Sequence, residues 1–132
     1  MAWRDTFKNV PVLMVDDEPK VLEGHRRTLR SHFDLHTALG GTAALEAMEA
    51  FGPFTVVVTD FKMPDMDGIS LLAKVADLYP DTVRMILTGY ADMDTAIRAV
   101  NTGAIFRFLT KPSTPEDLVM VISAGIKHAE MV

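Results

Sequence analysis

Acidic, hydroxyl and amine side chains recur in this sequence directly after short apolar runs. The groups that share this placement are Asp16-Asp17-Glu18, Asp60, Thr88-Gly89 and Thr110-Lys111-Pro112. Carboxylates that crowd together repel one another, and each raises the pKa of its neighbour unless a cation intervenes. A hard divalent ion that takes one or two carboxylates, several waters and a phosphate oxygen fits such a cluster, and Mg²⁺ is the natural candidate. If these side chains meet in space, they predict a magnesium site suited to a phosphoryl group.

The same residues could carry out phosphoryl transfer. A carboxylate oxygen of Asp60 could attack an in-line phosphoryl group and form an aspartyl-phosphate, and no general base is needed because the carboxylate is already ionised. The metal and Lys111 would share the developing negative charge, and the Thr88 hydroxyl would donate to a phosphoryl oxygen.

The apolar runs that precede these residues are predicted to be strands. They comprise residues 10–15, 33–38, 55–59, 83–87 and 105–109. The stretches at 13–15 and 56–58 are continuously apolar, which is typical of central parallel strands covered on both faces. Residues 33–38 are predicted to form an edge strand.

Between the strands, apolar residues recur at helical spacing and indicate covering helices. Three predicted stripes are Leu22, His25 and Leu29; Ile69, Leu72, Ala76 and Tyr79; and Met93, Ala96, Ile97 and Val100. Residues 43–51 are predicted to form a further helix that Gly52-Pro53 ends. The last helix is predicted to begin at Thr114, an N-cap followed by Pro115 at the first helical position.

Alternating strands and helices predict an α/β fold with a parallel sheet, right-handed crossovers and helices on both faces. In such a sheet, ligands bind outside the carboxyl ends of the strands, beside the point where the strand order reverses. The polar residues above stand at those ends, so we expect them to gather at one edge. A chain of 132 residues with 48% apolar content has room for one core, and we expect a single domain over residues 1–132.

The ordered polar set resembles the signature of response-regulator receiver domains of two-component signal transduction. Its elements are Asp16-Asp17, Asp60 with Met63-Pro64 and Gly68, Thr88-Gly89, and Lys111-Pro112. Each element is common by itself, but the set spans practically the whole chain in order and is specific. The resemblance implies a flavodoxin-like (βα)5 three-layer sandwich, chemotaxis-receiver-like, with a parallel five-stranded sheet of order 2-1-3-4-5. It also implies a phosphorylation-dependent switch that catalyses only its own phosphorylation and dephosphorylation, and so is not an enzyme in the usual sense.

The resemblance assigns roles around the metal residue by residue. Asp60 matches the phosphoacceptor, Asp17 the direct metal ligand, and Asp16 the carboxylate that holds the metal through water. The backbone carbonyl of Lys62 is expected to complete the protein's share of the Mg²⁺ coordination. In the family, side chains at the positions of Lys62 and Tyr90 gate water access to the aspartyl-phosphate, and Lys62 could also contact the phosphoryl group.

The resemblance also implies a switch. Thr88 matches the switch hydroxyl, Lys111 the phosphate-binding lysine, Phe108 the switch aromatic, and Pro112 a proline that follows a cis peptide. Phosphorylation is expected to draw Thr88 towards the phosphoryl group, to let Phe108 turn, and to remodel the face of the fourth helix, fifth strand and fifth helix. The expected surface residues of that face are Asp94, Arg98, Arg107 and Met120.

The implied partners are a sensor histidine kinase or phosphotransfer protein and a downstream output domain or target protein. A phosphorylation-dependent homodimer stays open. The formal net charge of -5 argues against direct nucleic-acid binding, because that affinity comes mainly from clustered Lys and Arg. Cysteine is absent and no apolar run reaches membrane-spanning length, so we expect a soluble cytoplasmic protein without membrane contact.

Other functions share parts of the pattern. A phosphohydrolase of the haloacid-dehalogenase type also uses an aspartate nucleophile, but it resembles Asp-x-Asp, whereas Lys62 stands two residues after Asp60. A flavin or nucleotide binder needs a glycine-rich phosphate cradle where this chain has Asp16-Asp17-Glu18-Pro19. A receiver-like module that no longer accepts phosphate is the third alternative, which phosphodonor labelling distinguishes.

Single residues also have simpler interpretations. Asp17 or Glu18 could merely cap the helix that follows them, and Thr88-Gly89 could merely form a turn.

Overall fold

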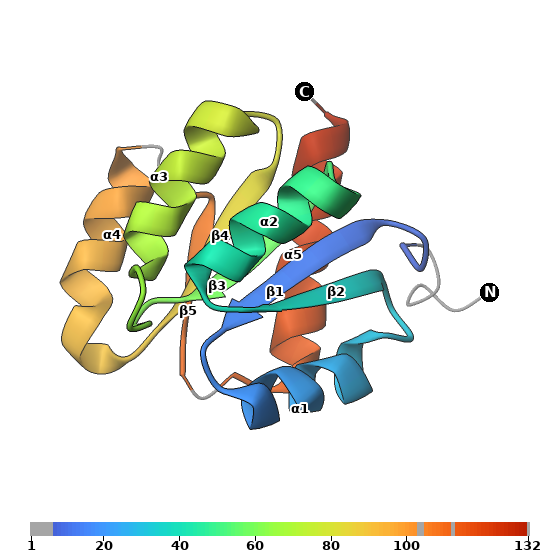
Figure 1. Cartoon of the computed structure of the whole chain (residues 1–132), viewed down its shortest axis with the longest axis horizontal. Helices are drawn as coiled ribbons and strands as arrows, with labels where there is room; N and C mark the ends of the chain where they lie inside the picture. Colours follow the sequence, from blue (N-terminus) through green and yellow to red (C-terminus); the bar gives the residue numbers. More distant parts are fainter. Residues whose placement is uncertain (1–6, 103–104, 112, 132) are drawn as a thin grey trace.

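The computed structural model describes residues 7–102, 105–111 and 113–131 (Figure 1). Within these residues, strands alternate with helices along the chain. The strands are β1 (Pro11–Asp16), β2 (Asp34–Leu39), β3 (Val56–Asp60), β4 (Val83–Thr88) and β5 (Arg107–Thr110). The helices are α1 (Pro19–Leu29), α2 (Gly41–Phe51), α3 (Gly68–Leu78), α4 (Met93–Asn101) and α5 (Pro115–Glu130), and the short 3-10 helix η2 (Tyr90–Asp92) precedes α4.

The strands of the described chain form one parallel sheet in the order β2-β1-β3-β4-β5. This confirms the flavodoxin-like order 2-1-3-4-5 and the edge position of β2. β1 pairs with both β2 and β3, so that Val12 lies between Leu35 and Val56. The strand order reverses at β1, and the carboxyl ends of β1 and β3 therefore lie side by side, which is where such folds bind ligands.

Helices cover both faces of the sheet and complete three layers (Figure 1). Val12 and Met14 of β1 pack on the face with α1 and α5, whereas Leu13 and Val15 pack on the face with α2, α3 and α4. Neighbouring residues of a strand point to opposite faces. A strand that is buried on both faces must therefore be apolar at every position, which explains the continuous apolar runs in β1 and β3.

The start of α5 agrees with the sequence prediction. Thr114 is the N-cap, its hydroxyl accepts a hydrogen bond from the Asp117 N–H at 3.1 Å, and Pro115 opens the helix. The buried positions of this helix are Leu118, Val119, Val121, Ile122, Gly125 and Ile126. The described helices include none that is both long and apolar enough to cross a membrane.

The buried faces of α3 and α4 differ from the predicted stripes. α3 buries Leu71, Leu72 and Val75, whereas the predicted Ile69, Ala76 and Tyr79 are only half-buried. α3 is apolar on more than one side, so spacing alone does not select its inner face. α4 buries the small residues Ala96 and Ala99 and leaves Ile97 39% exposed.

Candidate functional site

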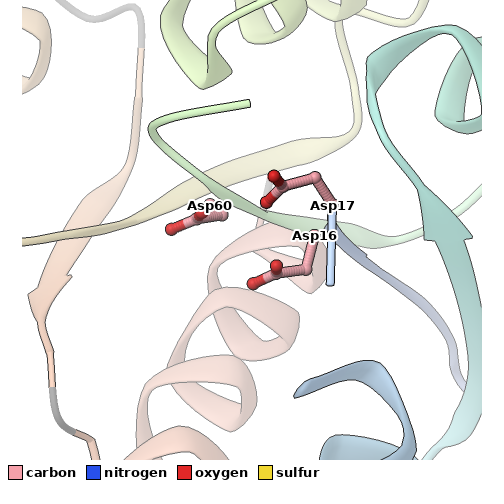
Figure 2. Close-up of side chains that lie close together, drawn as sticks. All are labelled: Asp16, Asp17 and Asp60. Carbon is pink, nitrogen blue, oxygen red and sulfur yellow. The ribbon is translucent and has the colours of Figure 1, made fainter. Parts of the chain in front are cut away.

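Three aspartates meet at the carboxyl edge of the sheet (Figure 2). Asp16 ends β1, Asp17 follows it, and Asp60 ends the neighbouring strand β3. One carboxylate oxygen of each residue lies within 4.8 Å of the others. Asp16 and Asp60 are buried, and Asp17 is exposed at the mouth of the cluster. The structure thus brings together the three carboxylates expected to hold a metal ion.

Asp16 is a buried carboxyl group whose pKa is raised. Burial raises the pKa of Asp16 to about 6, because removal from water disfavours the charged carboxylate. The Glu18 N–H donates to Asp16 Oδ1 at 3.0 Å and opposes the rise, while the charge of Asp60 adds to it. A cation bound between the carboxylates would favour their ionised forms.

Lys111 brings a positive charge to the nucleophile candidate. Its amine forms an ion pair with Asp60 Oδ1, and the Asp60 side chain is only 9% exposed. The Lys111 backbone N–H donates to the Thr88 carbonyl at 2.9 Å and fixes the base of the lysine side chain. The cis peptide predicted between Lys111 and Pro112 falls outside the described residues.

Thr88 ends β4, the strand next to β3. The residue is fully buried, and its hydroxyl donates to the Gly89 carbonyl at 3.2 Å. Asp60 pairs with Leu87 in the β3–β4 register, one residue before Thr88. The Thr88 hydroxyl, which donates to the adjacent Gly89 carbonyl, therefore lies at the end of the strand next to Asp60, the candidate nucleophile.

A family model described as the response regulator receiver domain matches residues 12–123. This chain belongs to the receiver-domain family. Receiver domains are the phosphorylation-based switches of two-component response regulators, and the chain is accordingly a signalling domain.

The receiver domain is similar to parts of two longer curated proteins. It is 34% identical over 117 residues to the hydrogenase transcriptional regulatory protein HoxA of Bradyrhizobium diazoefficiens, which covers 88% of this chain and 24% of that protein. It is 37% identical over 128 residues to the sensor kinase CckA of Brucella abortus, which covers 96% of this chain and 13% of that protein. The receiver domain thus spans a quarter or less of the length of these relatives.

Solved structures share the fold of the receiver domain. A crystal structure described as adenylate cyclase from Rhodopirellula baltica has a TM-score of 0.90 at 37% identity, covering 93% of this chain and 91% of that chain. A response regulator receiver domain protein from Clostridium thermocellum has a TM-score of 0.86 at 32% identity, covering 92% of this chain and 98% of that chain.

The Lys62 side chain lies away from the nucleophile candidate of the receiver domain. Its amine is 3.7 Å from Asp92 Oδ2, and the side chain is 74% exposed. The pair joins the β3–α3 loop to η2, so the amine pairs with Asp92 rather than with Asp60. The backbone carbonyl of Lys62 remains the candidate metal ligand. The side chain of Tyr90, the other expected gate, lies outside the described part of the structure.

Phe108 of the receiver domain lies in β5 opposite Ile86 and is half-buried. Its ring packs against the apolar cluster on the face of the sheet with α2, α3 and α4. Residues expected on the neighbouring surface are exposed as predicted: Asp94, Arg98, Arg107 and Met120.

The interpretation that Glu18 merely caps α1 is wrong. Glu18 is the N-cap residue, but its side chain makes no cap hydrogen bond, and its N–H donates to Asp16 instead. Asp17 belongs to the acidic cluster (Figure 2).

The sequence reasoning missed Asp65 in the β3–α3 loop. Its carboxylate accepts hydrogen bonds from backbone N–H groups of Gly41 and Thr42, at 3.3 and 2.9 Å. The sequence carried little signal for this contact, because Thr42 directly precedes the helix predicted at 43–51 and is itself a suitable cap. The helix instead begins at Gly41, and its N-cap residue Gly40 has no side chain.

Proposed function

We propose that this receiver domain is a switch in which Asp60 accepts a phosphoryl group with the help of Mg²⁺. One observation carries the proposal: Asp60 lies within 4.8 Å of Asp16 and Asp17, and its carboxylate also pairs with the amine of Lys111. A nucleophile, metal-binding oxygens and a cation for the transferred group therefore occupy one place. We further propose that the chain acts as a single domain, because its described residues build one sheet with an apolar cluster on each face.

The donor set suits Mg²⁺, which prefers carboxylate, carbonyl and water oxygens. Asp17 and Asp60 would bind it directly, Asp16 would bind through water, and Lys62 would offer its backbone carbonyl. When bound, the ion neutralises the carboxylates and the charge on the phosphoryl oxygens. The burial that raises the pKa of Asp16 to about 6 supports this role, because a buried carboxylate of this kind benefits from a nearby cation.

The transfer uses the Asp60 carboxylate and its partner Lys111 and needs no separate general base. An Asp60 oxygen forms a bond to phosphorus while the bond from phosphorus to the donor atom breaks, and the electron pair of that bond stays with the donor. When the donor is a phosphohistidine, the departing imidazole nitrogen keeps the pair and takes up a proton. Lys111, which pairs with Asp60 beforehand, then binds a phosphoryl oxygen.

A groove of about 540 Å³ beside α1 and α5 leads to this site. We propose that the phosphohistidine of a sensor histidine kinase, or of a phosphotransfer protein, approaches along it in the cytoplasm. Burial lowers the pKa of His25 in this groove, and the charge of Lys111 lowers it further, so the imidazole stays neutral and adds no charge near the donor. The lining combines apolar with polar residues: Val21, Leu87 and Leu118 with Asp16, Glu18, His25, Lys111 and Ser113.

Thr88 and Phe108 convert phosphorylation into a change of conformation. The Thr88 hydroxyl leaves the Gly89 carbonyl and donates to a phosphoryl oxygen, and the space it vacates is filled by Phe108. A shift from 1:99 to 99:1 requires about 5.5 kcal/mol of differential interaction. Bonds from Thr88 and Lys111 to the charged group, at about 1.5–3 kcal/mol each, supply an amount of that order.

The face of α4, β5 and α5 changes as a result and is read by a downstream output domain or target protein. Alternatively, two phosphorylated copies of the chain form a homodimer through this face. The similarity to parts of a transcriptional regulator and a sensor kinase supports a role beside such partners.

Acetyl phosphate labelling tests the proposal. The wild-type domain should gain one phosphoryl group by intact mass when Mg²⁺ is present, and chelation of the metal should prevent the gain. Asp60→Asn should gain none. Equal labelling of Asp60→Asn would refute Asp60 as the acceptor, and steady hydrolysis of many phosphate esters per molecule would favour the phosphohydrolase alternative.

A further inference from the structure

We propose that Asp65 is a positioning residue that clamps together the two chain segments carrying the metal ligands. The proposal rests on the function proposed above, because it concerns the same magnesium site. Asp65 itself does not touch that site. It acts through the β2–α2 turn on one side and through the β3–α3 loop on the other.

The carboxylate of Asp65 supplies the missing cap of α2. Gly40 is the N-cap residue of this helix and has no side chain that could accept a hydrogen bond. Asp65 Oδ1 accepts from the Gly41 N–H at 3.3 Å, and Oδ2 accepts from the Thr42 N–H at 2.9 Å. Free N–H groups and the positive end of the helix dipole favour an anion at this place. The hydrogen bond from the Thr42 N–H lowers the pKa of Asp65 to about 2, with smaller contributions from the Gly41 and Met66 N–H groups. The Asp65 carboxylate is therefore charged near neutral pH.

The two segments also fit each other in shape. Gly40 has a φ of 90°, and a Cβ on it would lie 3.1 Å from Asp65 Oδ1. A Cβ on Gly41 would collide with Cγ of Met66. Both glycines therefore allow the β3–α3 loop to lie directly against the start of α2, and a left-handed φ at Gly40 is one that other residues rarely adopt.

The clamp reaches the metal ligands through short backbone connections. The Gly40 N–H donates to the Asp16 carbonyl at 3.0 Å, so the turn that Asp65 holds is bonded to the end of β1. On the other side, the Asp65 backbone lies three residues from Lys62, whose carbonyl is the proposed ligand. Asp65 thus ties the β1 end that carries Asp16 to the loop that leaves Asp60.

Other contacts hold the β3–α3 loop against β3, β4 and the core, on either side of Lys62. The Phe61 N–H donates to the Leu87 carbonyl at 3.0 Å, and the Gly68 N–H donates to the Phe61 carbonyl at 2.7 Å. Met63 is buried on the inner side. The Lys62 side chain is 74% exposed and pairs with Asp92 at 3.7 Å, and a pair with such an exposed amine constrains the backbone weakly. Asp65 adds the contact that joins this loop to the β2–α2 turn, through the Gly41 and Thr42 N–H groups.

Magnesium titration of the unphosphorylated domain by calorimetry tests the clamp. Residues that support metal ligands typically change metal affinity 10- to 100-fold when removed, and we expect Asp65→Ala to bind Mg²⁺ about tenfold more weakly. Asp65→Asn keeps an oxygen that can accept from Thr42, and we expect it to recover most of the affinity. Amide resonances of residues 40–42 and 61–63 should move together in Asp65→Ala.

Two controls separate the clamp from general effects. Thr114→Ala removes the cap of α5, and Asp77→Ala removes an exposed carboxylate of α3; both should bind Mg²⁺ like the wild type. If Asp65→Ala bound as tightly as the wild type, or no more weakly than these controls, the clamp would be wrong. If the wild type itself bound no Mg²⁺, the proposed metal site would fail instead.

Discussion

Lys111 reaches across a whole strand to pair with Asp60. The lysine follows β5 and the aspartate ends β3, with β4 and its terminal Thr88 between them in the sheet. In the sheet, Lys111 therefore follows a strand on one side of β3, and Asp16 and Asp17 stand at the end of β1 on the other side. We propose that the amine that pairs with Asp60 in this structure remains on the transferred group after phosphorylation.

Removal of this amine should slow phosphorylation. Preorganised donors and cations at a reacting oxygen are often worth about 100-fold or more in rate, and we expect a loss of that order in Lys111→Ala. Lys111→Arg keeps the charge and should retain part of the rate. The initial rate of acetyl phosphate labelling at saturating Mg²⁺ measures the effect, and an unchanged rate in Lys111→Ala would remove the lysine from the mechanism.

Asp16 should make stability depend on pH. The pKa of this carboxyl is raised by burial from 3.8 to about 6, so the folded state binds more protons than the unfolded state between these values. Its contribution is fully present below pH 3.8 and is lost as the pH rises through about 6. A shift of this size corresponds to on the order of 1–3 kcal/mol.

Asp16→Asn should therefore stabilise the metal-free domain at pH 7.5 by that order and have little effect near pH 4. The asparagine oxygen can still accept from the Glu18 N–H. Urea unfolding in a chelating buffer measures the difference, with Asp77→Asn as an exposed control. A variant less stable than the wild type at pH 7.5 would contradict the electrostatic account.

The sheet and its polar edge were predictable because they depend on local patterns. Continuous apolar runs mark β1 and β3, and the polar residues that follow them meet because neighbouring parallel strands end at one edge. α2 was predicted to begin at residue 43, but it begins at Gly41. Its cap comes from Asp65, a residue distant in sequence, and no local pattern predicts such a contact. The pairing of Lys62 with Asp92 joins the β3–α3 loop to η2 and was missed for the same reason.

Thr88 should affect the conformational response to phosphorylation more than the phosphorylation of Asp60 itself. In Thr88→Ala, acetyl phosphate should still label Asp60, while the change at α4 and β5 should weaken, because no hydroxyl turns to the phosphoryl group. Amide NMR with and without beryllofluoride measures the response at residues 91–100 and 105–109. Thr88→Ser keeps the hydroxyl and should respond like the wild type. A full response in Thr88→Ala would show that another residue transmits the signal.

The Lys62 side chain should be dispensable for the metal. Its amine pairs with Asp92 at 3.7 Å and is mostly exposed, so only the backbone carbonyl is available to the ion. We expect Lys62→Ala to bind Mg²⁺ at least as tightly as the wild type, since it also removes a positive charge nearby. Calorimetric titration tests this, and a large loss of affinity would show that the side chain shapes the site.

Asp60 is the residue proposed to carry the phosphoryl group. Borohydride reduces an acyl phosphate to the corresponding alcohol, so treatment of the phosphorylated domain converts the modified aspartate to homoserine. Peptide mapping by mass spectrometry then identifies the position. We predict homoserine at position 60 in samples phosphorylated with Mg²⁺ and at no aspartate position in samples without it. Homoserine at position 16 or 17 with Asp60 intact would contradict it.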